Sequence, residues 1–202
     1  MLKRLQFSMA TLFMLVLIAE PFLAQRPRRD YRNLEKVVLD ELKATRTPGA
    51  VVAVVGGDRV IYAKGFGISN VETGAPVTPD MLFRVGSITK MLTATVLVSL
   101  SEEGRITLDT PVGDAVKGLG PRLSRLTAHQ LLSHSAGIID YAHTCCAQDE
   151  SALATEVRAY KDADYFFTEP GRIFSYSNPS YNIAGYIIQE LCGKLYADAM
   201  DQ

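Results

Sequence analysis

The chain contains a single pair of strand-like runs, which limits what it can fold into by itself. Ala50–Val55 is an apolar, Val-rich run, and Arg59–Lys64 contains β-branched and aromatic residues. Gly56-Gly57-Asp58 lies between them as a glycine-rich turn, so the two runs are predicted to form a β-hairpin. A two-stranded sheet is at best marginally stable in water. We therefore expect the sheet to be completed by strands that this chain does not contain.

The rest of the chain is predicted to be mainly helical, because apolar residues recur at helical spacing. The helix beginning near Ser87 is apolar nearly all round, which predicts that it is buried. Thr127 is a suitable N-cap for a short helix, and Gly193 ends the last helix. The predicted helices are Tyr31–Thr45, Ser87–Glu103, Ala128–Ser133, Glu150–Lys161 and Ser180–Leu191, and a short extended piece is expected at Met81–Val85.

The composition excludes several classes of protein. The chain has 202 residues, of which 48% are hydrophobic, and its formal net charge is -1. It therefore has no basic excess that would bind nucleic acid. Its three cysteines show no C-x-x-C spacing, which argues against a disulfide scaffold or a zinc ribbon. His129, His134 and His143 form no H-E-x-x-H motif, and neither a Walker A loop nor a G-x-S-x-G motif is present. We expect no metal, no cofactor and no nucleic-acid partner.

The N-terminal segment, residues 1–24, is predicted to be a secretory signal peptide. Two basic residues precede Phe7–Ala19, which is almost wholly apolar. A helix of this length rises only about 20 Å, too little for the roughly 30 Å core of a bilayer. Cleavage near Ala24-Gln25 would leave an exported domain, residues 25–202, that is periplasmic or secreted and has no stable membrane span. A buried N-terminal helix and an uncleaved anchor are the alternatives.

Export would place the cysteines in an oxidising compartment. Cys145 and Cys146 are adjacent, and either one could pair with Cys192, which would leave one thiol over. The simpler interpretation is that all three are small buried residues without a role. A metal cluster of His143, Cys145 and Cys146 would lack a fourth ligand at any usual spacing.

The strongest candidates for catalysis are Ser87 and Lys90, at the start of a predicted helix. Residues three apart lie on the same helical face, so Ser87 Oγ and Lys90 Nζ could meet. The free N–H groups at a helix N-terminus favour negative charge developing there. A buried, neutral lysine could take the serine proton. A solvated Ser-x-x-Lys pair is the common alternative, but the apolar neighbours favour burial of the lysine: Phe83, Val85, Ile88, Met91 and Leu92.

A second candidate element is Tyr176-Ser177-Asn178. A tyrosine phenol can relay a proton if nearby cations lower its pKa. The Asn178 amide can donate to a substrate carbonyl and accept from Lys90. Taken alone, this segment would be an ordinary loop with an asparagine turn. His134 is interpreted as a structural hydrogen-bonding residue beside the short helix.

Together these segments resemble a known superfamily. Phe83–Lys90 resembles the nucleophile segment of the serine β-lactamases and penicillin-binding proteins, which carry Ser-x-x-Lys. Leu131–Ile138 is similar to the segment that lies between the two motifs in the class C branch. Glu169–Tyr181 is similar to the Tyr-x-Asn region of that branch. The resemblance covers about Leu34 to Lys194, and the branch includes class C β-lactamases, D-alanyl-D-alanine carboxypeptidases and esterases.

The resemblance implies a fold and a set of roles. The fold would be α/β (α+β) and β-lactamase-like, with an antiparallel sheet flanked by helices and an all-helical subdomain. Ser87 would be the acylated nucleophile, and its backbone N–H would be one oxyanion donor. Lys90 would activate Ser87, and Tyr176 would share the proton transfer. Asn178 would position Lys90 and the substrate carbonyl.

One family element has no counterpart in this chain. No Lys- or His-x-Gly motif follows Asn178, although in the family that strand supplies the second oxyanion donor. We therefore expect the N-terminal part of the domain, without the C-terminal sheet strands. The expected function is an exported serine hydrolase that forms an acyl-enzyme with a β-lactam, a D-Ala-D-Ala peptide or a small ester. Its partner would thus be a small molecule or a peptidoglycan peptide. The alternative is a non-catalytic or inactive truncated fragment of that family, a binding or pseudo-enzyme module. In either case we expect the isolated chain to be poorly soluble or molten, because the missing strands leave apolar faces open to solvent.

Overall fold

The computed structural model describes residues 30–140 and 149–201, which form two compact units. The N-terminal unit ends at Phe83, and the C-terminal unit begins at Arg84. The predicted signal peptide, His143 and the cysteine pair at 145–146 lie outside the described residues, so the expectations for them stay predictions. No helix among the described residues is both long and apolar enough to span a bilayer.

The N-terminal unit consists of one helix and the predicted hairpin. Its elements are α2 (Arg32–Thr45), β1 (Gly49–Gly56) and β2 (Arg59–Gly67). The strands pair antiparallel from Gly49 opposite Gly67 to Gly56 opposite Arg59, with an irregularity between Val54 and Val55. The predicted helix and hairpin are therefore confirmed. Met81–Val85, in contrast, forms no strand, because it pairs with no other extended segment in the part of the chain described.

Helix α2 packs against β2. Leu34, Val38 and Leu42 recur every fourth residue on α2 and are half-buried. Glu35 accepts hydrogen bonds from Lys64 Nζ at 2.6 Å and from Tyr62 Oη at 3.1 Å, so the helix is also tied to β2 by polar contacts. The Lys64 hydrogen bond holds the pKa of Glu35 below its usual value.

The other face of the hairpin stays open within the N-terminal unit. Strand residues alternate between the two faces, so Ala53, Ile61 and Ala63 lie opposite the face that carries Tyr62. All three are exposed. The sheet of the described residues has two strands, and this face of it carries exposed apolar side chains.

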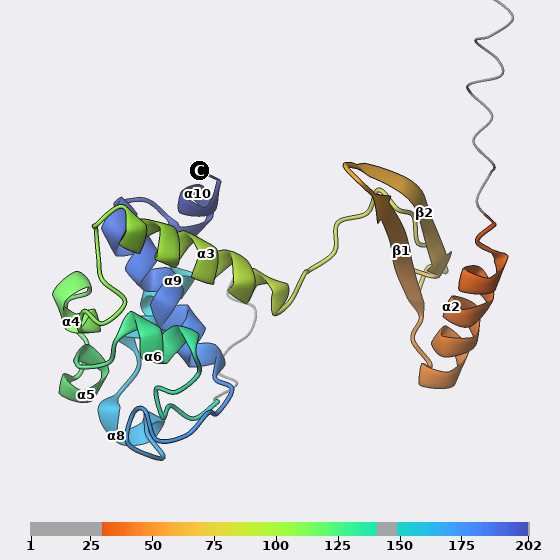
Figure 1. Ribbon diagram of the computed structural model, residues 1–202. Coiled ribbons are helices and arrows are strands. Elements are labelled where there is room, and N and C mark those ends of the chain that lie inside the picture. The colour runs from red at the N-terminus through yellow and green to blue at the C-terminus, as the bar shows by residue number, and fades with distance from the viewer. Residues whose placement is uncertain (1–29, 141–148, 202) are drawn as a thin grey trace, which may run out of the picture. The chain divides into compact units, whose positions relative to one another are not determined.

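Among its described residues, the C-terminal unit has helices and isolated β-bridges but no strands, and it is built around α9 (Figure 1). Helix α9 packs against α3, α4, α6, α7 and α10. The helices of this unit are α3 (Ile88–Glu102), α4 (Val112–Ala115), α5 (Pro121–Ser124), α6 (Ala128–Leu132), α7 (Ala152–Arg158), α8 (Asp162–Tyr165), α9 (Asn178–Cys192) and α10 (Tyr196–Met200). The fold class is thus as the resemblance implied, an antiparallel sheet with a helix beside it and an all-helical part.

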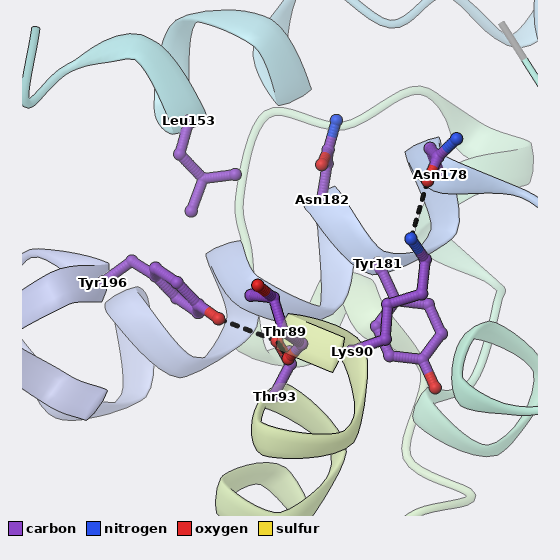
Figure 2. Close-up of a pocket in the computed structure, with 8 residues that line it drawn as sticks. All are labelled: Thr89, Lys90, Thr93, Leu153, Asn178, Tyr181, Asn182 and Tyr196. Atoms are coloured by element: carbon purple, nitrogen blue, oxygen red, sulfur yellow. Dashed lines mark hydrogen bonds between the residues drawn. The ribbon is translucent and has the colours of Figure 1, made fainter. Parts of the chain in front are cut away.

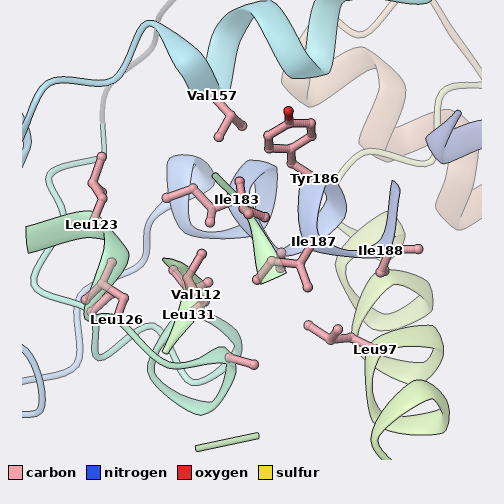
Figure 3. Packing of buried hydrophobic residues seen from close by; sticks show 14 of the residues in the cluster. Leu97, Val112, Leu123, Leu126, Leu131, Val157, Ile183, Tyr186, Ile187 and Ile188 are labelled. Atoms are coloured by element: carbon pink, nitrogen blue, oxygen red, sulfur yellow. The ribbon is translucent and has the colours of Figure 1, made fainter. Parts of the chain in front are cut away.

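The core of this unit is a cluster of apolar side chains around α9. Ile183, Tyr186, Ile187 and Ile188 are fully buried along this helix. Figure 3 shows them facing side chains from the surrounding helices and loops, namely Leu97, Val112, Leu123, Leu126, Leu131 and Val157. Burying a side chain of this size contributes about 1.5–3 kcal/mol, so α9 fixes the positions of the helices around it.

Helix α3 is buried on one side only. Its buried residues are Thr93, Leu97 and Leu100. Met91 is 62% exposed and Leu92 46% exposed, although the sequence predicted a helix buried all round. That prediction was wrong for the C-terminal unit by itself, because α9 and α10 cover only the Thr93 side of α3.

Local sequence signals explain where some of the helices begin and end. Thr127 and Gln130 form a reciprocal capping box at α6, as the predicted N-cap required. Gly193 ends α9 with φ 62°. The helix predicted at Glu150–Lys161 is shorter, because the chain extends at Lys161 and restarts as α8. This extension lets Asp162 accept hydrogen bonds from the backbone N–H groups of α5.

Gly137 occupies a position where a larger side chain would be both strained and too close to a neighbouring backbone. It has φ 73°, and a Cβ atom built there would lie 2.5 Å from Thr168 O. Gly104 has a similar φ of 74°, but a Cβ atom there would have nothing within 4 Å. Gly104→Ala is expected to cost about 1 kcal/mol for the left-handed backbone alone. Gly137→Ala is expected to cost about 1–3 kcal/mol more for the steric overlap.

Urea unfolding of both variants measures this difference. Equal losses of the free energy of unfolding would contradict the prediction, because they would mean that Thr168 moves away without cost.

Candidate active site

The first turn of α3 carries Ser87 and Lys90. Gly86 has φ 54°, a left-handed conformation that turns the chain into the helix. Ser87 then occupies the N-cap position, and its side chain makes no capping hydrogen bond. Its hydroxyl is therefore available to other partners. Lys90 Nζ lies 3.4 Å from Ser87 Oγ, one helical turn along the chain.

The start of α9 brings Tyr176 and Asn178 to the same place. Ser177 caps α9, so Asn178 is the first helical residue, not part of the turn considered from sequence. Lys90 Nζ donates a 2.6 Å hydrogen bond to Asn178 Oδ1. The hydroxyls of Ser87 and Tyr176 are hydrogen-bonded at 2.7 Å. The residues singled out in the sequence thus form one connected cluster within the C-terminal unit.

Electrostatics within this cluster lower the pKa of Tyr176. The neighbouring Lys90 side chain is the largest cause that lowers the pKa of Tyr176, and the hydrogen bond with Ser87 is the second. Lys90 Nζ also lies 4.8 Å from the centre of the Tyr176 ring, within range of a cation–π contact. A phenol in this environment releases its proton at a lower pH than a free tyrosine does.

Burial of Lys90 was expected from its apolar neighbours, and that expectation was wrong. Lys90 is only half-buried. Val85, Ile88 and Met91 are between 53% and 62% exposed, so they do not enclose it. The reason is that the packed side of α3 carries Thr93 and Leu97, one and two turns further along the helix.

His134 supports the loop that carries Tyr176. Its ring stacks on the Tyr176 ring with centroids 4.5 Å apart. Its Nδ1 accepts a hydrogen bond from Ser177 N at 3.1 Å, and its carbonyl accepts from Ser175 N at 2.9 Å. This agrees with the structural role inferred from the sequence. Burial is the main cause that lowers the pKa of His134, followed by the Lys90 charge.

Asp140 also belongs to this cluster, although no sequence pattern singled it out. Its Oδ1 accepts hydrogen bonds from Asn178 N at 2.8 Å and from Asn178 Nδ2 at 3.1 Å. No spacing rule connects two residues 38 positions apart. The one available signal was the position of Asp140, which lies two residues after the recognised segment Leu131–Ile138.

A pocket of about 280 Å³ opens beside this cluster (Figure 2). Lys90 and Asn178 lie at one end, and Leu153 and Tyr196 lie at the other. Thr93 Oγ1 and Tyr196 Oη are hydrogen-bonded at 2.7 Å and link α3 to α10. The remaining lining residues are Thr89, Tyr181 and Asn182. Among the described residues, no group of His, Cys, Asp and Glu side chains is arranged to hold a metal ion.

The chain matches a known family over most of its length. The family model described as Beta-lactamase matches residues 34–202. The chain belongs to the beta-lactamase family. The resemblance seen in the sequence is thereby confirmed, including the wider superfamily of serine β-lactamases and penicillin-binding proteins.

Individual relatives agree with this assignment. Penicillin-binding protein 4 of Amycolatopsis lactamdurans is 34% identical over 158 residues, covering 76% of this chain and 41% of that protein. An octameric penicillin-binding protein homologue from Pyrococcus abyssi has a TM-score of 0.71 at 30% identity, covering 86% of this chain and 42% of that one. A class C beta lactamase from Rhodobacter sphaeroides has a TM-score of 0.61 at 32% identity, covering 81% and 45%.

The chain therefore spans less than half the length of these relatives. Truncation of the domain remains a prediction.

The environment of His134 predicts a pH dependence of stability. Because burial lowers the pKa of His134 below its ordinary value of 6.5, the unfolded chain binds this proton first as the pH falls. The stability linked to His134 is thus present above pH 6.5 and is lost as the pH falls from 6.5 through the folded pKa. His134→Asn should reduce this loss, since asparagine tolerates the left-handed φ of 56° and cannot titrate.

Thermal unfolding of the chain between about pH 7.5 and pH 5.5 checks this. His129→Asn is the matched control, because the His129 side chain is 68% exposed. The prediction fails if both variants lose stability with pH as steeply as the parent chain.

Proposed function

We propose that this chain is the N-terminal part of an exported serine hydrolase that is acylated on Ser87. Its substrate is a β-lactam, a D-Ala-D-Ala peptide or a small ester. The observation that carries the proposal is the 2.7 Å hydrogen bond between Ser87 Oγ and Tyr176 Oη, with Lys90 Nζ beside both. Membership of the beta-lactamase family supports the reaction class. Export rests on the apolar N-terminal segment.

In the proposed first step, Ser87 Oγ attacks the substrate carbonyl carbon while its proton passes to Tyr176. Tyr176 Oη is the nearer base, because Lys90 Nζ lies 3.4 Å from Ser87 Oγ. The carbonyl electron pair moves to oxygen and returns as the leaving group departs with the proton from Tyr176. The product is an ester between Ser87 and the acyl group. A water molecule then attacks this ester and gives a proton to Tyr176. Tyr176 passes that proton to Ser87 Oγ as the ester bond breaks, which releases the acid and restores the serine.

Lys90 and Asn178 stabilise this proton transfer. The Lys90 cation favours the Tyr176 phenolate, and Asn178 Oδ1 holds Lys90 in place. The backbone N–H of Ser87 donates no hydrogen bond within residues 30–140 and 149–201, so it is free to bind a developing oxyanion.

Covalent labelling tests Ser87 as the nucleophile. Exposure to a fluorescent penicillin or an activated ester should add one acyl group to Ser87, which mass spectrometry of the digested chain locates. Ser87→Ala should abolish the adduct. Ser99→Ala, which removes an exposed serine from the same helix, should leave it unchanged.

An adduct that persists in Ser87→Ala would remove Ser87 as the nucleophile. No adduct with any of these reagents on the parent chain would favour the alternative, a non-catalytic fragment.

The pH dependence of acylation tests the roles of Tyr176 and Lys90. The rate should rise with pH with a midpoint below 10.0, the ordinary pKa of tyrosine, because Lys90 lowers the pKa of Tyr176. Lys90→Ala should move the midpoint up towards 10.0, since it removes the largest cause of the shift. Tyr176→Phe should slow acylation by about a hundredfold or more and remove this rise.

Lys90→Arg separates charge from proton transfer, because arginine keeps its proton in this pH range. The proposal expects Lys90→Arg to keep a midpoint below that of Lys90→Ala. If Tyr176→Phe kept the pH profile while Lys90→Arg lost all activity, Lys90 would be the base.

A further inference from the structure

The orientation of the Asn178 amide decides whether it can hold Lys90. An amide presents an oxygen on one side and an NH₂ group on the other, and only the oxygen can accept from the Lys90 ammonium. In the structure, Asn178 Oδ1 lies 2.6 Å from Lys90 Nζ, and Nδ2 lies 3.1 Å from Asp140 Oδ1. Asn178 thus lies between a cation and a carboxylate.

These two charges favour the same orientation. An ionised carboxylate only accepts hydrogen bonds, so Asp140 can pair with Nδ2 and not with Oδ1. If the amide of Asn178 were reversed, its NH₂ group would face Lys90 and its oxygen would face Asp140. Both hydrogen bonds would be lost, and two unfavourable contacts would replace them.

The backbone places Asp140 firmly at this point. The preceding residue, Ile139, donates its N–H to Tyr165 O at 2.8 Å, and Ile138 is buried and forms a β-bridge with Phe166. Asp140 also accepts from the backbone N–H of Asn178 at 2.8 Å. This N–H is one of the groups at the start of α9 that lack an intrahelical acceptor, and a negative charge is favoured there.

We infer that Asp140 is a positioning residue, which fixes the Asn178 amide so that its oxygen holds Lys90 beside Ser87 and Tyr176. This inference rests on the proposed function of Ser87. It also leaves one of the two Nδ2 hydrogens of Asn178 for a substrate carbonyl, because Asp140 takes only the other. Asp140 makes no hydrogen bond to Ser87 or Lys90 among the described residues, so it acts on them through Asn178. Its charge also acts directly on Tyr176, whose pKa it raises as the smallest of the causes at work there.

A double-mutant cycle separates positioning from helix capping. Asp140→Ala is expected to slow acylation of Ser87 about tenfold or more, the effect of losing a hydrogen bond to a charged group. In an Asn178→Ala background, the same change should alter the rate by less than about twofold, because no amide remains to be oriented. The loss of melting temperature should be similar in both backgrounds, since the backbone N–H of residue 178 loses its acceptor in each.

Asp162→Ala is the matched control. Asp162 also caps a helix, α5, through the backbone N–H groups of Arg122 and Leu123, and no hydrogen bond among the described residues joins it to Asn178. It should lower the melting temperature and show no coupling to Asn178→Ala in the acylation rate. An equal loss of rate from Asp140→Ala in both backgrounds would overturn the inference and leave Asp140 as a helix cap.

A second readout does not depend on acylation. The side-chain amide of Asn178 gives a pair of proton–nitrogen NMR signals that Asn178→Ala identifies by their loss. Asp140→Ala should shift these signals, and Asp162→Ala should not. If the parent chain takes no adduct, the proposed function fails, yet these signals still test the orientation. Signals that Asp140→Ala leaves unmoved overturn the inference whether or not Ser87 is acylated.

Discussion

The packing of α3 against α9 is the contact on which the candidate active site depends. Leu97 and Ile188 are both fully buried between the helices of this core (Figure 3). The same packing brings the first turns of the two helices together, so Lys90 on one can reach Asn178 on the other at 2.6 Å. Each exposed polar contact of the site contributes little to the free energy of folding, whereas burial of the apolar core beneath it contributes much more. The packing of the core therefore determines where the first turns of α3 and α9 lie, and the polar side chains form their hydrogen bonds within that arrangement.

The sequence predicted those parts of the molecule that depend on local rules. The hairpin, the N-cap at Thr127 and the helix end at Gly193 each follow from residues adjacent in the chain. The approach of Ser87 to Lys90 follows from helical periodicity. Their convergence with Tyr176 and Asn178 could be expected only from the family resemblance, because 88 and 89 positions separate the partners.

What the sequence could not provide depends on tertiary packing. Asp140 is placed by a β-bridge at Ile138, and nothing in its neighbours marks it as a partner of Asn178. The exposure of Met91 and Leu92 depends on which side of α3 meets α9, and apolar content alone does not determine that side. Half-burial of Lys90 has the same origin. In our proposal the first proton transfer goes to Tyr176, whose Oη lies nearer to Ser87 Oγ than Lys90 Nζ does.

The hydrogen bond between Thr93 and Tyr196 has a consequence for the order in which the chain folds. These residues are 103 positions apart, and α9, around which the core packs, also follows α3 and α6 in the chain. During synthesis, α3 and α6 therefore leave the ribosome before their packing partner exists. Their apolar sides stay uncovered until α9 has been synthesised, and contacts between segments distant in sequence form slowly. The nascent chain would be most vulnerable to chaperone capture and proteolysis in this interval, after Ser87 has been made and before the helix that gives it its neighbours.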